Sequence, residues 1–170
     1  MIQKQYKVFR CVQYLQILKF LIPLLIASQG IAAAPFTNIG SSMIKDQNTG
    51  LIWQQCSAGR SGSTCASGTP TITTWPSALV YCTGLTWAGK IWRLPSIKEL
   101  QSIVDKTKSS PAVDTTFFPG TLNGFYWSST TYVGDLSKAW FINFTTGIVT
   151  PHLGKTKAGS SMYIRCVSGP

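Results

Sequence analysis

Acidic residues and histidine are scarce in this chain. Its 170 residues include five Asp and Glu, one His and only 12% charged residues. This composition leaves little material for acid–base catalysis or metal binding, so we expect no metal and no other cofactor. The 15 Gly, nine Pro and 12% aromatic residues exclude a coiled coil and a simple helical bundle. With 44% hydrophobic residues, the chain is also too apolar for a disordered polyanion-binding tail.

The apolar run near the N-terminus is too short to cross a membrane. Phe20–Ala27 has eight residues before polar residues interrupt it, whereas a spanning helix needs about 20. Four basic residues precede or adjoin this run and small residues follow it at 31–34, a pattern typical of a cleaved signal peptide. We therefore expect residues 1–34 to be a signal peptide and 35–170 to be a single domain. That domain would be secreted or periplasmic, with no membrane span after processing.

Five cysteines are present, and one of them, Cys11, lies in the predicted leader. An even number then remains in an exported domain, which indicates two disulfides with three possible pairings. Metal-type C-x-x-C spacing is absent. We favour Cys56–Cys65, across a Gly/Ser-rich loop, and Cys82–Cys166, which ties the middle of the chain to its end. Loop-closure entropy predicts about 4–5 kcal/mol of stability for the long bridge and about 2–3 kcal/mol for the short one.

Turn residues and hydrophobic periodicity predict an α+β domain with two helices packed on short antiparallel sheets. A hairpin is expected around the turn 46–50. One helix is predicted from Thr74 to Gly84, and a second after the capping box of Ser96 and Glu99. The C-terminal third is expected to be β, ending in a strand over 163–167 that carries Cys166.

Seven collinear blocks of the sequence resemble the Lcl C-terminal domain family, named for the end domain of Legionella collagen-like adhesins. They span about 49–168 and read TGLIWQQC, TWPSALVYC, WRLPSIKELQSIVD, VDTTFFP, YWSSTTY, AWFINFTTGIV and YIRCV. The resemblance implies a C-type lectin-like fold, related to formylglycine-generating-enzyme-like domains. It also supports Cys82–Cys166 as the closing disulfide.

The same resemblance implies export and adhesion to sulfated glycosaminoglycan through a basic surface, with a trimer as a possible assembly. The chain differs from the collagen-like adhesins in having no Gly-x-y stretch. Four of its 15 basic residues lie in the leader, so 11 basic residues face five acidic ones in the predicted domain. This excess of positive charge attracts polyanions by Coulomb steering.

Five lysines in predicted loops are the candidate contacts for anionic polysaccharide or host glycan: Lys106, Lys108, Lys138, Lys155 and Lys157. The alternative is that they are merely solvated. Lysine binds anions as a point charge, so such a patch would be unselective and salt-sensitive.

Tryptophan and arginine side chains are further candidates for ligand contact. Trp87, in a loop, is a candidate for stacking on a sugar ring, whereas Trp53, Trp127 and Trp140 are expected in the core. Arg93 is expected to be partly buried and structural, with Asp105 or Asp114 as its partner. A calcium-dependent sugar site lacks the clustered carboxylates it would need.

The leading hypothesis is therefore an exported adhesive module, not an enzyme. One alternative is an enzyme of the formylglycine-generating-like branch, whose chemistry uses free cysteines to hold copper. Another is a surface interaction domain that binds no glycan. Specific nucleic-acid binding is supported only by charge and is not expected.

Overall fold

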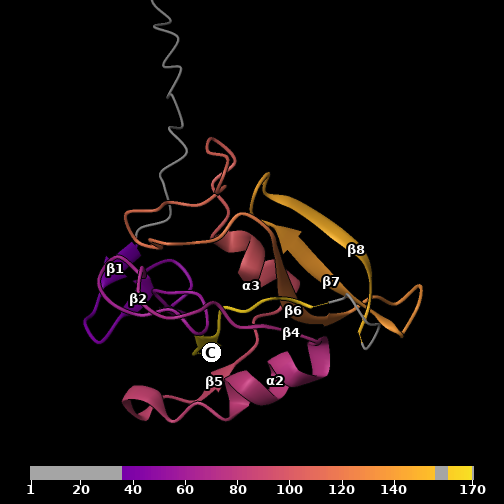
Figure 1. The fold of residues 1–170 in the computed structure, drawn as a ribbon, viewed down its shortest axis with the longest axis horizontal. Helices are drawn as coiled ribbons and strands as arrows, with labels where there is room; N and C mark the ends of the chain where they lie inside the picture. Colours follow the sequence, from indigo (N-terminus) through magenta and orange to yellow (C-terminus); the bar gives the residue numbers. More distant parts are fainter. Residues whose placement is uncertain (1–35, 156–160, 170) are drawn as a thin grey trace, which may run out of the picture. The chain divides into compact units, whose positions relative to one another are not determined.

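Two five-stranded sheets and two α-helices make up the computed structural model, which describes residues 36–155 and 161–169 (Figure 1). The first sheet has the order β1-β2-β3-β10-β5 and consists of β1 (Phe36–Asn38), β2 (Met43–Asp46), β3 (Ile52–Gln54), β5 (Trp92–Arg93) and β10 (Val167–Ser168). The second has the order β4-β9-β6-β7-β8 and consists of β4 (Ile72–Thr73), β6 (Phe125–Thr131), β7 (Lys138–Asn143), β8 (Ile148–Gly154) and β9 (Met162–Tyr163). All pairings are antiparallel except that of β6 with β9. The α+β prediction is confirmed.

The predicted N-terminal hairpin is formed by β2 and β3. Asp46 is buried at the start of its turn, where one carboxylate oxygen accepts the backbone N–H of Asn48 at 2.9 Å and the other accepts the hydroxyl of Thr49 at 2.7 Å. Gly50 closes the turn with φ of 74°, a conformation that favours glycine. Side-chain hydrogen bonds to the turn backbone thus set the register of the hairpin.

Both predicted helices are present. Helix α2 (Trp75–Thr83) ends at Gly84 as expected, but the hydroxyl of Thr74 bonds Ser77 Oγ instead of capping the helix. Helix α3 (Ile97–Ser102) has the full capping box predicted from the sequence. Helix α2 contacts β5 and β6, and α3 contacts β6 and β7, with the strands β4 and β6 running between the two helices in Figure 1.

The end of the chain differs from the prediction of one continuous strand. Two short strands, β9 and β10, lie in different sheets, and Ile164–Cys166 connect them. Cys166 therefore precedes β10 and is not on a strand. The chain must cross from one sheet to the other at this point, and a residue that crosses cannot stay in either hydrogen-bonded ladder.

Two hydrophobic clusters fill the interior. One packs α2 against β5, β6 and β7 around Trp92 and Trp127, and the other packs α3 between the sheets around Trp53. Trp53 and Trp127 are fully buried, as predicted. Trp140 is only half-buried, because β7 lies next to the edge strand β8 and its indole packs edge-on against Tyr132 at 5.6 Å between ring centroids.

The two disulfides are those favoured from the sequence. Cys56–Cys65 closes the Gly/Ser-rich loop, with Cα atoms 5.3 Å apart. Cys82–Cys166 joins α2 to the crossing segment between β9 and β10, with Cα atoms 5.6 Å apart. The second bridge spans 84 residues and holds the end of the chain in the centre of the domain.

Arg165 is the largest fully buried charged side chain of the described residues. Its guanidinium donates to the carbonyl oxygens of Gln54 and Gln55 and to the hydroxyls of Ser57 and Thr121. No side-chain carboxylate pairs with it. Burial lowers the pKa of Arg165, yet an arginine stays charged at neutral pH. The charge is thus solvated by protein dipoles that link three distant segments.

Candidate functional site

The four candidate lysines that the structure describes lie at two opposite ends of the β7–β8 ribbon. The loop that carries Lys106 and Lys108 is hydrogen-bonded to the far end of β7, where the N–H of Ala112 donates to the carbonyl of Phe144 at 2.6 Å. Lys138 begins β7 at the other end and pairs in register with Gly154. Six residues of strand put about 17 Å between these ends. The lysines therefore form two groups.

Nearby carboxylates offset the charge of two of these lysines. The ammonium of Lys108 lies 3.3 Å from Asp114 and 3.6 Å from Asp105, and that of Lys138 lies 3.2 Å from Asp135. Hydrogen bonds from Thr107 lower the pKa of Asp105, which keeps that carboxylate ionised. Exposed pairs of this kind contribute little stability, but they reduce the positive charge available to a ligand.

Lys155 is occupied within the fold. Its ammonium donates to the hydroxyl of Thr131 at 2.7 Å and to the carbonyl oxygen of Leu136 at 2.9 Å. The same nitrogen lies 4.3 Å from the ring centroid of Trp75, a cation–π contact. Lys155 thus ties the β6–β7 connection to the start of α2. Lys157, the neighbouring candidate, lies outside the described residues.

Lys106 is the most available of the candidates. It is exposed and makes no hydrogen bond or ion pair with any residue that the structure describes. Its neighbour Asp105 accepts instead from Thr107 and Lys108. The loop after α3 therefore presents one uncompensated ammonium, which lies beside a second, partly neutralised one.

Trp87 lines an open pocket of about 360 Å³. It belongs to the 3₁₀-helix η1 (Trp87–Gly89) that follows α2, and Tyr81 and Leu85 line the same side of the pocket. One face of its indole stacks on Trp92 at 5.4 Å between ring centroids, and Trp92 Nε1 donates to the carbonyl oxygen of Trp87 at 2.9 Å. The candidate for sugar stacking is therefore held rigidly and half-buried at a pocket wall.

The loop 56–61, which the sequence indicated only as a disulfide-closed loop, also lines the pocket. Arg60 and Ser61 come from this loop, and Gln54 comes from the end of β3. The loop folds back tightly at Gly59, where φ is 78° and a Cβ would lie 2.2 Å from the carbonyl oxygen of Thr69. Arg60 Nη1 donates to the carbonyl of Gly68 at 3.1 Å, which orients the guanidinium. Arg60 could not be identified from the sequence, because only this long-range packing brings it into the same pocket as Trp87.

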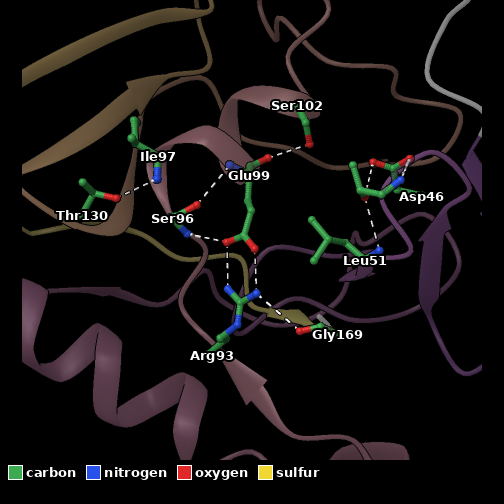
Figure 2. A network of polar contacts seen from close by, with 10 residues as sticks. Asp46, Leu51, Arg93, Ser96, Ile97, Glu99, Ser102, Thr130 and Gly169 are labelled. Carbon is green, nitrogen blue, oxygen red and sulfur yellow. Dashed lines mark hydrogen bonds and ion pairs between the residues drawn. The ribbon is translucent and has the colours of Figure 1, made fainter.

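Arg93 pairs with Glu99, not with Asp105 or Asp114 as the sequence analysis expected (Figure 2). Its Nη1 and Nη2 donate to the two carboxylate oxygens of Glu99 at 2.8 and 2.6 Å. Glu99 also accepts the backbone N–H of Ser96 at 2.7 Å in the capping box. The short turn from β5 into α3 brings the two side chains together. Arg93 is thus a structural residue that braces the start of α3.

The Arg93–Glu99 pair predicts an acid-sensitive contribution to stability. Donation from Arg93 lowers the pKa of Glu99 below its ordinary value of 4.5, burial opposes this shift, and Ser96 adds to it. A carboxylate whose pKa is lower in the folded than in the unfolded state stabilises the fold at pH values above its unfolded pKa. This stabilisation is lost as the pH falls through its folded pKa. We expect the melting temperature of the wild type to fall more steeply below about pH 4.5 than that of Glu99→Gln.

Thermal melts between pH 7 and pH 3 check this result. The advantage of the wild type over Glu99→Gln should shrink as the pH is lowered. Lys98→Gln is a matched control, because this exposed neighbour on α3 lies outside the capping box. A difference between the wild type and Glu99→Gln that stays constant with pH would contradict the assignment.

Neither a metal cluster nor a spanning helix occurs in the described part of the chain. Residues 36–155 and 161–169 contain no group of three or more His, Cys, Asp or Glu side chains that could hold a metal ion. No helix in the same ranges is long and apolar enough to cross a membrane.

The fold and the pocket define a small, disulfide-bonded α+β domain with a basic surface. The chain belongs to the Lcl C-terminal domain family, whose model matches residues 42–168, and this confirms the resemblance seen in the sequence. Membership of this family makes the chain an adhesin-associated module. No curated protein sequence matches the chain.

Proposed function

We propose that this chain is an exported module that adheres to anionic polysaccharide, of which sulfated host glycosaminoglycan is the leading example. Membership of an adhesin-associated family and two disulfides, which suit an oxidising compartment, support the proposal. A C-type lectin-like fold is part of it, supported by the closing bridge from α2 to the last crossing of the chain. A trimer remains the assembly that the family suggests.

The observation that carries the proposal is that every acidic side chain is already engaged. Asp46 is buried in its turn, Glu99 is held by Arg93, and the other three carboxylates pair with Lys108 or Lys138. Six further cations that are exposed or half-buried have no carboxylate within ion-pair distance among the described residues: Lys45, Arg60, Lys90, Lys98, Lys106 and Lys155. A surface with uncompensated cations and no free acid favours polyanions and repels other cations.

The state of the cysteines favours adhesion over the alternative enzyme. Copper-dependent chemistry of the formylglycine-generating type needs free thiols. Here Cys56, Cys65, Cys82 and Cys166 are all joined in disulfides. A binding role needs none of these thiols and gains rigidity from both bridges.

Two matched double variants test which lysines contact the polymer. Lys106→Gln with Lys108→Gln should elute from heparin at clearly lower salt than the wild type, because that loop presents an unengaged ammonium. Lys138→Gln with Lys155→Gln removes the same charge at the other end of the ribbon and should shift elution less, since Lys155 is bonded to Thr131 and Leu136. The measurement is the elution salt concentration on immobilised heparin, with circular dichroism as a folding control.

The outcomes of this experiment separate three cases. Lower elution salt for the first variant alone supports the loop after α3 as a contact. Equal shifts for both variants would mean that net charge alone retains the protein. No shift for either variant would contradict the lysine contacts in these two groups.

A further inference from the structure

We propose that the pocket at Trp87 is a subsite for one acidic sugar residue, with the carboxylate of the sugar at Arg60 and its ring against the indole. This inference deepens the proposed function and rests on it for the polymer to which that sugar belongs. Whereas the lysine loop recognises charge alone, the pocket would recognise a particular kind of sugar.

The walls of the pocket are held in place before any ligand arrives. The N–H of Ala58 donates to the carbonyl of Ile164 at 2.9 Å, and the N–H of Thr71 donates to the carbonyl of Ala58 at 2.8 Å. The Cys56–Cys65 bridge closes the same loop. A volume of about 360 Å³ lies at the lower end of small-molecule sites, which suits a single sugar residue better than a large ligand.

The aromatic wall fits the apolar face of a pyranose. Trp92 covers one face of the Trp87 indole. Trp87 is half-buried and lines the pocket, so its second face is the one that a ligand can contact. Tyr81 and Leu85 extend the same wall. A rigid ring of this kind gives contact area at low entropic cost.

The polar wall supplies unused donors. Nη1 of Arg60 donates to the carbonyl of Gly68, whereas Nη2 has no acceptor among the described residues; Nε also has none, but it is buried away from the pocket opening. The Oε1 atom of Gln54 accepts the N–H of Cys166 at 2.9 Å, which leaves the amide NH₂ of Gln54 without a partner in the described structure. Nη2 can therefore donate a charge-assisted hydrogen bond to one oxygen of a carboxylate, and the amide NH₂ of Gln54 supplies a second donor in the same pocket.

No acidic side chain opposes an anion in this pocket. None of its lining residues is Asp or Glu. Arg60 also has no carboxylate partner elsewhere among the described residues. A pocket lined by aromatic side chains and by an arginine without a carboxylate partner favours a ring that is apolar on one face and negatively charged at its edge, which describes a uronic acid residue.

Calorimetric titration of the protein with an unsulfated tetrasaccharide of alternating glucuronate and N-acetylglucosamine tests the proposal. The carboxyl-reduced tetrasaccharide is the neutral control. We expect the acidic form to bind and the reduced form to bind at least about tenfold more weakly, the usual effect of losing a charged hydrogen bond. Arg60→Gln should lower affinity for the acidic form by a similar factor and leave binding of the reduced form unchanged.

Two further variants keep the test decisive. Ser61→Glu places a carboxylate in the pocket at an exposed position, with little risk to folding, and should also abolish binding of the acidic tetrasaccharide. Lys106→Gln removes one charge outside the pocket and should change its affinity less than twofold. Equal binding of the two tetrasaccharides, or an equal effect of Lys106→Gln and Arg60→Gln, would overturn the proposal. Tighter binding of a carboxyl-reduced but sulfated tetrasaccharide would also overturn it, in favour of sulfate.

Heparin retention distinguishes this proposal from the proposed function. Arg60→Gln should elute from heparin close to the wild type, because one of several cations is removed. Loss of tetrasaccharide binding with retained heparin binding supports the pocket. Normal heparin retention without any tetrasaccharide binding by the wild type overturns the pocket and leaves the adhesion proposal intact. Tetrasaccharide binding without heparin retention would support the pocket and contradict the adhesion proposal.

Discussion

Replacing Cys82 and Cys166 together with alanine should lower the free energy of unfolding by about 4–5 kcal/mol. The bridge closes a loop of 84 residues, so its loss restores a large conformational entropy to the unfolded chain. Small domains are stable by only about 5–15 kcal/mol, so the variant should be close to unfolding at room temperature. Denaturant unfolding followed by tryptophan fluorescence measures the change.

The second disulfide provides the matched control. Cys56→Ala with Cys65→Ala opens a loop of only nine residues and should cost about 2–3 kcal/mol. Non-reducing mass mapping of the wild type should recover both cysteine pairs. A smaller loss for the Cys82–Cys166 variant than for the Cys56–Cys65 variant would contradict the role of the long bridge.

Arg165→Met should destabilise the domain by about 3 kcal/mol or more. The substitution leaves the carbonyls of Gln54 and Gln55 without their donor, and likewise the hydroxyl of Thr121. A buried acceptor left unsatisfied costs about 1–3 kcal/mol. Removing the buried charge and the unpartnered Nε offsets only part of this cost, because four acceptors already solvate the Nη1 and Nη2 atoms. Urea unfolding gives the change in free energy.

Arg165→Lys separates charge from shape. A lysine keeps the charge, but its ammonium is a point that cannot reach the two sides of the site as the guanidinium fork does. We therefore expect Arg165→Lys to be destabilised as well, whereas Lys45→Met on β2 should change stability by less than about 0.5 kcal/mol. If Arg165→Lys were as stable as the wild type, the fork geometry would not matter and the interpretation would be wrong.

Local features of the fold could be predicted because their causes are local. The turn at Asp46 and the capping box of Ser96 each depend on side-chain hydrogen bonds within three residues. The disulfide Cys56–Cys65 was predictable from its short spacing across a Gly/Ser-rich loop, whereas Cys82–Cys166 was favoured among the remaining pairings by the family resemblance. The end of α3 depends on a longer-range contact: the helix stops at Ser102, and Val104 just beyond it pairs with Val113 in an isolated bridge.

The sites depend on long-range contacts and were harder to predict. Lys155 resembles a solvated loop lysine in the sequence, yet Thr131 and Trp75 occupy its ammonium. No neighbouring acid or polar motif in the sequence indicates that Arg165 is buried, since its partners lie 44 to 111 residues away. Arg60 likewise gains its place in the pocket only when loop 56–61 packs against the distant chain end. Trp87 could be proposed because an aromatic residue in a polar loop is itself a signal.

Binding of a heparin-derived oligosaccharide by the disulfide-bonded protein, measured by calorimetry at about 50 mM and about 200 mM salt, tests the adhesion proposal most directly. Uncompensated lysines at the surface predict clear binding at the lower concentration and much weaker binding at the higher one, with no binding of neutral dextran under either condition. Absence of binding at the lower salt concentration, or an affinity that does not change with salt, would contradict the proposal.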